Sequence, residues 1–176
     1  MDRHILITGR PGSGKTTLIR RVVKKLPYPA HGFYTKEIRQ DGRRQGFALV
    51  TLTGQRGLLA HVKRSGSPRV GRYGVDVSTL QQLGVKSIEQ AIEMDGLIVI
   101  DEIGPMELLS DPFRQIVRRA LNGDKPVLAT IVSRSLPFAD QIKTRPDVTL
   151  ITVSPNNRDR LAVQITERLE MILTSR

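Results

Sequence analysis

The stretch that decides the fold is Gly9-Arg10-Pro11-Gly12-Ser13-Gly14-Lys15-Thr16. It matches the spacing G-x-x-x-x-G-K-[ST] in full. An apolar run at 4–8 precedes it, and the segment 16–26 that follows has apolar residues at helical spacing. A strand, a glycine-rich turn and a helix in this order are typical of a loop that holds nucleotide phosphates. The sequence therefore predicts a phosphate loop at 9–16.

Each part of this loop has a physical role in phosphate binding. Glycines let successive backbone N–H groups turn toward phosphate oxygens, and the start of a helix adds the positive end of its dipole. We expect Lys15 to reach the β- and γ-phosphates, Thr16 to bind Mg²⁺ and Thr17 to meet the α-phosphate. The predicted nucleotide-binding residues are Gly9, Arg10, Pro11, Gly12, Ser13, Gly14, Lys15, Thr16 and Thr17.

A pair of acids forms the second motif. Four apolar residues at 97–100 are followed directly by Asp101 and Glu102, which is typical of a buried parallel strand with two carboxylates at its end. Asp101 is expected to hold Mg²⁺, together with Thr16. Glu102 is expected to orient the attacking water as a general base, so Glu102 and Lys15 are the predicted catalytic residues.

The rest of the chain predicts an α/β fold. Expected strands lie at 4–8, 32–38, 47–52, 58–62, 97–100, 127–132 and 148–153, with a short edge strand at 73–77. Expected helices lie at 16–26, 87–94, 110–121 and 138–143, with a last one that Asn156 or Asn157 caps and that ends near Leu173. Alternating strands and helices predict a mostly parallel sheet covered on both faces, with an antiparallel, β-rich extension at roughly 30–77.

Length and composition limit the alternatives. A chain of 176 residues fits one domain, 1–176, which we expect to be a monomer. The absence of cysteine excludes disulfides and thiolate metal sites, and the three histidines do not cluster. No signal peptide and no apolar run long enough to span a membrane are present, so the expected location is the cytoplasm, with no membrane partner.

The positive charge is concentrated in one half of the chain. The net charge is +11, and residues 3–72 carry 16 basic side chains against only Glu37 and Asp41. Such a surface attracts anionic nucleotides toward the phosphate loop. The same charge also fits a nucleic-acid face, which the sequence leaves open.

Two further segments supply candidate contacts to the nucleotide. The strand at 127–132 is expected to lie between the phosphate-loop strand and the acidic strand, so Arg134 just after it becomes a candidate arginine finger for the γ-phosphate. The segment 154–159 follows the last strand, where ligands of open α/β sheets bind, and Asn157 and Arg158 are the candidate base or phosphate contacts. Glu107 is interpreted as a surface residue or as a residue that lies behind those in contact with the ligand.

Together these motifs give a family resemblance over nearly the whole chain. It rests on G-R-P-G-S-G-K-T-T-L at 9–18, G-F-Y-T-K-E-I-R at 32–39, V-G-R-Y-G-V at 70–75, D-E-I-G-P-M-E at 101–107 and N-R-D at 157–159. The chain resembles the small nucleoside-triphosphatase family of thermophilic archaea and bacteria, related to the human cancer-related nucleoside triphosphatase. The resemblance implies a P-loop NTPase fold with a RecA-like three-layer α/β/α core. Pro105 stands where the family often has lysine.

The expected activity is therefore hydrolysis of nucleoside triphosphates. ATP, GTP and other triphosphates would be cleaved to the diphosphate and phosphate, with Mg²⁺ as cofactor and the triphosphate as partner. Two alternatives use the same loop. One is a nucleotide or polynucleotide kinase, for which the Arg-rich segment 39–72 would serve as a lid. The other is an RNA-binding module gated by nucleoside triphosphate, against which the acidic pair argues.

Overall fold

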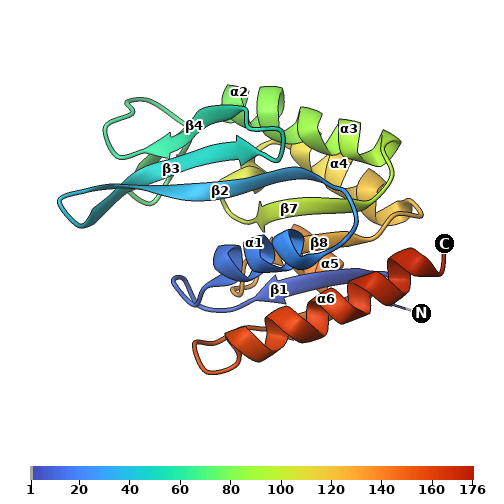
Figure 1. Ribbon diagram of the computed structural model, residues 1–176. Helices are drawn as coiled ribbons and strands as arrows, with labels where there is room; N and C mark the ends of the chain where they lie inside the picture. Colours follow the sequence, from blue (N-terminus) through green and yellow to red (C-terminus); the bar gives the residue numbers. More distant parts are fainter. Residues whose placement is uncertain (1) are drawn as a thin grey trace.

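The computed structural model describes residues 2–176, and those residues form one nine-stranded sheet with the order β5-β6-β4-β3-β2-β7-β8-β1-β9 (Figure 1). Five neighbouring strands are parallel: β9 (Val148–Thr152), β1 (His4–Thr8), β8 (Val127–Ile131), β7 (Leu97–Ile103) and β2 (Ala30–Gln40). Their central members are continuous apolar runs, as strands covered on both faces require. The predicted parallel sheet is confirmed.

The remaining strands form the predicted antiparallel extension. They are β3 (Arg43–Thr51), β4 (Arg56–His61), β6 (Tyr73–Val75) and β5 (Arg69–Val70). Asp41 and Gly42 both have positive φ and join β2 to β3, so the hairpin that the Asp-Gly turn predicted is present. The edge strand is the two-residue β5, whereas the segment predicted as the edge, at 73–77, supplies the inner strand β6.

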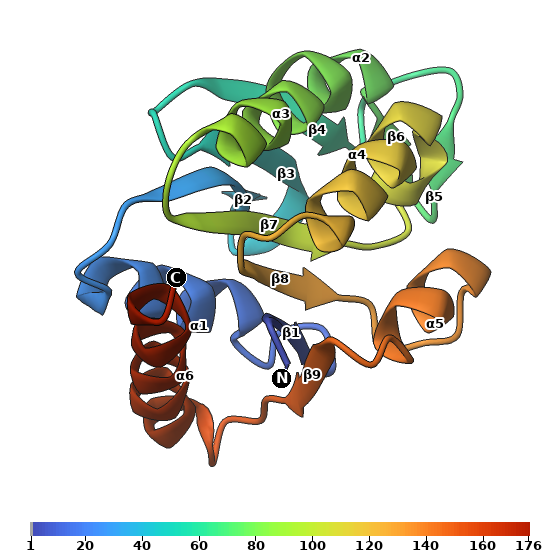
Figure 2. The ribbon, with the colours of Figure 1, turned by 90° about the vertical axis from the view of Figure 1, so that its right-hand side faces the viewer.

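Helices cover both faces of the sheet. Figure 2 shows α1 (Lys15–Lys25) and α6 (Arg158–Thr174) side by side on one face. The opposite face carries α3 (Lys86–Glu93), α4 (Asp111–Asn122) and α5 (Pro137–Lys143). Alternate residues of one strand serve the two layers: Ile5 and Ile7 pack with α1 and α6, while Leu6 packs on the other side. This is the three-layer architecture that the sequence predicted.

The position of β8 matters for the site. It pairs with β1 on one side and with β7 on the other, so the phosphate-loop strand and the acidic strand are not neighbours. The sequence predicted this insertion correctly. Because all three strands are parallel, their carboxyl ends meet at one edge of the sheet, and the residues that follow them share one surface.

Three short segments complete the fold. The chain between β6 and α3 forms a single α-helical turn, α2 (Val77–Thr79), and then a π-helix, η1 (Leu80–Val85). Neither was predicted. A 3₁₀ turn, η2 (Glu107–Leu109), follows β7 and leads to α4, whose first turn is capped by the hydroxyl of Ser110. Among residues 2–176, every helix is too short or too polar to cross a membrane.

Candidate functional site

The phosphate loop joins the end of β1 to the start of α1. Lys15 is the first helical residue, and its ammonium donates hydrogen bonds to the carbonyl oxygens of Gly9, at 3.0 Å, and Arg10, at 3.4 Å. Gly14 has φ +96°, and a Cβ there would lie 2.6 Å from a guanidinium nitrogen of Arg158. The loop therefore needs glycine at this position for both its backbone and its neighbour.

Asp101 is fixed by hydrogen bonds from three different strands or helices. Thr16 donates its hydroxyl to Oδ2 at 2.8 Å, Thr130 donates its hydroxyl to Oδ1 at 2.6 Å, and the backbone N–H of Thr35 donates to Oδ2 at 3.2 Å. The side chain is fully buried. Burial raises the pKa of Asp101, and the hydrogen bonds to its carboxylate oppose that rise. Thr16 and Asp101, predicted to share a metal ion, are thus in direct contact.

Glu102 lies beside the lysine of the phosphate loop. Its Oε2 is 3.9 Å from Nζ of Lys15. Burial raises the pKa of Glu102, the charge of Lys15 lowers it, and the charge of Asp101 raises it. A carboxylate with a raised pKa beside the lysine of the predicted phosphate loop has the character of a general base.

Glu107 is a functional candidate that the sequence analysis missed. It is buried rather than at the surface, and burial together with the charge of Glu102 raises the pKa of Glu107 well above its usual value. The signal was present in the sequence, since Glu107 stands between Met106 and Leu108 in a short apolar turn. Of the two interpretations of Glu107 from the sequence, a surface position was wrong, and a position behind the residues that contact the substrate stays a prediction.

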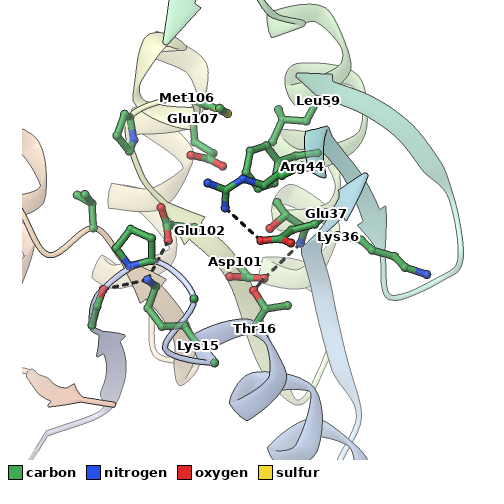
Figure 3. A pocket seen from close by; sticks show the side chains of 18 of the residues that line it. Lys15, Thr16, Lys36, Glu37, Arg44, Leu59, Asp101, Glu102, Met106 and Glu107 are labelled. Atoms are coloured by element: carbon green, nitrogen blue, oxygen red, sulfur yellow. Dashed lines mark hydrogen bonds and ion pairs between the residues drawn. The ribbon is translucent and has the colours of Figure 1, made fainter. Parts of the chain in front are cut away.

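These groups line one cavity of about 720 Å³. Figure 3 shows Lys15, Thr16, Asp101 and Glu102 at one end of it, with Glu37 of β2 and Arg44 of β3 near them. Lys36 points away from this group of side chains. The cavity thus has a floor built from the parallel strands and a wall built from β2, β3, β4 and β6. A volume of this size is typical of pockets that enclose whole ligands.

The other predicted contacts differ in their placement. Arg158 lines the cavity and covers Gly14, and its Nε is buried without a hydrogen-bond partner among residues 2–176. Asn157 instead holds the preceding loop: its Oδ1 accepts from the N–H of Ser154, and its Nδ2 donates to the carbonyl oxygen of Thr152. Arg134 is exposed and is not among the residues that line the cavity, so its role as an arginine finger stays a prediction.

Within the loop itself, most predicted residues face the cavity. The cavity-lining members are Gly9, Pro11, Gly12, Gly14, Lys15, Thr16 and Thr17. Arg10 is exposed, and Ser13 is buried with its hydroxyl unpartnered among the described residues. The unpartnered polar atoms of Ser13 and Arg158 both lie around the phosphate loop, where anionic oxygens are expected to bind.

The oxygen atoms of this site fit a Mg²⁺ ion that the protein and a bound phosphate would hold together. A hydroxyl and a carboxylate, from Thr16 and Asp101, are the hard oxygen ligands that Mg²⁺ prefers. Residues 2–176 contain no group of three or more His, Cys, Asp or Glu side chains that could hold a metal ion by themselves. Such a site suits an ion completed by water and phosphate oxygens rather than a protein cage.

Comparison with known proteins identifies the family. Residues 4–166 match the family described as NTPase. The chain is 47% identical over 161 residues to the nucleoside-triphosphatase THEP1 of Thermotoga sp. strain RQ2, and the match covers 92% of each chain. The chain belongs to the NTPase family. The phosphate loop and the acidic pair, at 9–16 and 101–102, both fall inside the matched region.

Two solved structures of this NTPase family share the fold. The crystal structure of THEP1 from the hyperthermophile Aquifex aeolicus has a TM-score of 0.89 and 36% identity, and covers 95% of this chain and 99% of its own. The solution structure of a human cancer-related nucleoside triphosphatase has a TM-score of 0.82 and 39% identity, with 96% and 98% covered. The resemblance noted from the sequence motifs is therefore confirmed over nearly the full length.

Proposed function

We propose that this NTPase family member hydrolyses nucleoside triphosphates such as ATP and GTP to the diphosphate and phosphate, with Mg²⁺, as a single-domain monomer. The observation that carries the proposal is the position of Glu102. Its carboxylate is 3.9 Å from the ammonium of Lys15 and adjoins Asp101, which is hydrogen-bonded to Thr16. A base therefore stands where a γ-phosphate held by Lys15 and a metal held by Thr16 and Asp101 would meet.

The phosphate loop supplies binding. Backbone N–H groups of the loop at 9–16, in which Pro11 has none, would donate to the phosphates, and Lys15 would exchange its carbonyl partners for β- and γ-phosphate oxygens. Arg158, with one nitrogen unpartnered beside Gly14, is placed to contact a phosphate or the ribose on the outer side of the loop. Bound Mg²⁺ supplies positive charge that offsets the charge developing on the β- and γ-phosphate oxygens.

Glu102 supplies the chemistry of the attacking water. Its carboxylate first accepts a hydrogen bond from the attacking water. It then takes a proton from that water while the water oxygen forms a bond to the γ-phosphorus. The bond from that phosphorus to the β–γ bridging oxygen breaks, and its electron pair leaves with the diphosphate. Lys15 keeps the γ-phosphate in line and stabilises the oxygens on which charge develops.

The test separates binding from chemistry. In Glu102→Gln, with the shape kept and the base removed, we expect turnover of ATP and GTP to fall at least about 100-fold while nucleotide affinity changes little. Lys15→Ala is expected to weaken both. The matched control is Glu89→Gln, the same change at an exposed position of α3 far from the cavity, which should leave turnover unaltered. Undiminished phosphate release by Glu102→Gln would remove Glu102 from this role.

A further inference from the structure

The cavity has a second end that hydrolysis alone does not use. The far end is lined by Arg39, Arg44, Phe47, Leu59, Val70 and Tyr73, all from strands β2 to β6. The whole cavity measures about 720 Å³, and the triphosphate is proposed to occupy the end formed by the phosphate loop. The far end lies outside the residues proposed to hold the triphosphate and the attacking water, so it is open to a further ligand.

Arg44 is held in one orientation by three neighbours at this end. Its Nε donates to the hydroxyl of Tyr73 at 3.1 Å, and its Nη1 donates to Oε1 of Glu37 at 3.1 Å. Its guanidinium carbon lies 5.2 Å from the ring centre of Phe47. An arginine fixed in this way is pre-organised for a planar anion, since little side-chain entropy remains to be lost.

The orientation of Arg44 leaves donors available to a ligand. In the part of the chain that the structure describes, its Nη2 has no hydrogen-bond partner, and Figure 3 shows the guanidinium inside the cavity. A guanidinium has five N–H donors, of which Arg44 uses two on the protein. The remaining donors form the edge that binds phosphate oxygens in two-pronged fashion.

Positive charge is in excess around Arg44. Glu37 is the carboxylate partner of both Arg39 and Arg44, and Arg72 donates to the hydroxyl of Tyr73 and the carbonyl oxygen of Arg44. Three guanidinium groups therefore stand against two carboxyl groups at this end, Glu37 and the buried Glu107 that lines the same cavity. Burial raises the pKa of Tyr73, but hydrogen bonds from Arg72 and Arg44 lower it by more, so the pKa of Tyr73 lies below its usual value. The far end thus favours an anion even with Glu37 in place.

The remaining lining of the far end is apolar. Phe47, Leu59 and Val70 contribute side chains that cannot bind phosphate but can cover a carbon-rich group. A free phosphate would leave this surface uncovered, whereas a phosphate ester would cover it and remove apolar area from water. The chemistry of the far end therefore matches a small molecule with one phosphate group and an apolar or aromatic body.

We propose that the far end of the cavity binds a small phosphomonoester at the same time as the triphosphate occupies the phosphate loop, with Arg44 and Arg39 holding its phosphate group. The proposal rests on the proposed function, because it takes the loop as the nucleotide site. The second ligand then lies between the γ-phosphate position and the antiparallel wall, with the ester body against Phe47, Leu59 and Val70.

The test measures binding to a protein whose phosphate loop is already filled. The protein is saturated with Mg²⁺ and the non-hydrolysable analogue AMP-PNP, and AMP or inorganic phosphate is then titrated in by calorimetry. We expect AMP to bind once per chain and more tightly than phosphate. Arg44→Gln and Arg39→Gln should each weaken AMP binding at least tenfold. Arg43→Gln, an exposed neighbour outside the cavity, is the matched control and should leave it unchanged.

Other outcomes overturn the proposal. Absence of AMP binding to the loaded protein, equal binding in Arg44→Gln and Arg39→Gln, or phosphate binding as tightly as AMP would each show that the far end is not a phosphomonoester site. Arg39→Gln decides the matter if Arg44→Gln does not fold, which circular dichroism would reveal. AMP-PNP affinity, measured in the first step of the same titration, tests the nucleotide site separately from the second ligand.

Discussion

The hydroxyl of Thr130, at the end of β8, donates a 2.6 Å hydrogen bond to Oδ1 of Asp101, at the end of β7. Both side chains are fully buried, and Thr16 donates to the other oxygen of the same carboxylate. The carboxylate proposed to hold Mg²⁺ is therefore oriented from both sides. Partners of this kind set the direction of a metal ligand and its basicity.

Removing the hydroxyl of Thr130 should weaken metal binding more than nucleotide binding. In Thr130→Val we expect the Mg²⁺ concentration for half-maximal hydrolysis to rise about tenfold or more. A Mg²⁺ titration at saturating ATP measures this. Thr149→Val, which makes the same change at the start of β9, should leave the Mg²⁺ requirement as it is. An unchanged requirement in Thr130→Val would mean that Asp101 does not depend on this bond for its role.

Arg158 should affect binding of the substrate more than its cleavage. It covers Gly14 and has a buried nitrogen without a partner among residues 2–176, so its loss removes a charged contact to the ligand. We expect Arg158→Ala to raise KM about tenfold, as for the loss of one charge-assisted hydrogen bond, with a smaller change in kcat. Steady-state kinetics with ATP checks this, with Arg160→Ala, a change at an exposed position of α6, as the matched control. A fall in kcat at constant KM would instead make Arg158 a group that acts in the transition state.

Gly32 should be indispensable for joining the two halves of the sheet. It pairs with Val99 between β2 and β7 and has φ +124°, and a Cβ at this position would lie 2.0 Å from the carbonyl oxygen of Val99. We expect Gly32→Ala to lower the free energy of unfolding by about 2–4 kcal/mol, measured in urea. Gly42→Ala, in an open turn at φ +73° with no atom within 4 Å, should cost only about 1 kcal/mol. Equal losses in both variants would exclude the clash as the cause.

His4 should make the protein less stable in mild acid. Its ring is buried, with Nδ1 accepting from the N–H of Val127 and Nε2 close to the carbonyl oxygen of Leu121, and burial lowers its pKa to about 4. The unfolded chain takes up this proton near pH 6.5 and the folded chain only near pH 4. The contribution of His4 to the free energy of unfolding is therefore complete above pH 6.5. This contribution falls by about 3 kcal/mol as the pH drops to 4.

Urea unfolding at several pH values measures this loss. In His4→Gln, which cannot titrate, the decline between pH 6.5 and pH 4 should be much shallower, although its stability at pH 7 is lower than that of the wild type. His31→Gln, the same substitution at a half-buried position of β2, is the matched control. A His4→Gln curve that declines as steeply as the wild-type curve in this window would contradict the lowered pKa of His4.

Most of the parallel half of the molecule could be predicted from local sequence. Residues 97–102 form a buried strand that ends in acids because four apolar residues must be covered on both faces, and the glycines of the phosphate loop fit only a tight strand-to-helix turn. The insertion of β8 between β1 and β7 was also correct. These features depend on periodicity and turn chemistry, which short stretches of sequence carry.

The parts that escaped prediction depend on contacts between distant residues. Thr130 lies 29 residues from Asp101, and nothing near either one indicates their hydrogen bond. Asn156 or Asn157 was expected to cap α6, and Asn157 does stand at the N-cap position, but its side chain holds the loop at 152–154 instead of bonding to the helix. The π-helical turn at Leu80–Val85 and the diagonal pairing of Arg44 with Glu37 likewise follow from packing across the extension rather than from propensity.

The order of the strands has a consequence for how the molecule opens. β7, which carries Asp101 and Glu102, is hydrogen-bonded on both sides, whereas β5 and β6 at one edge are only two and three residues long. Backbone amides of short edge strands exchange with solvent through small local openings, while central strands exchange only when the whole domain unfolds. We therefore expect the backbone that carries the two carboxylates to exchange its amide hydrogens far more slowly than the antiparallel edge of the sheet.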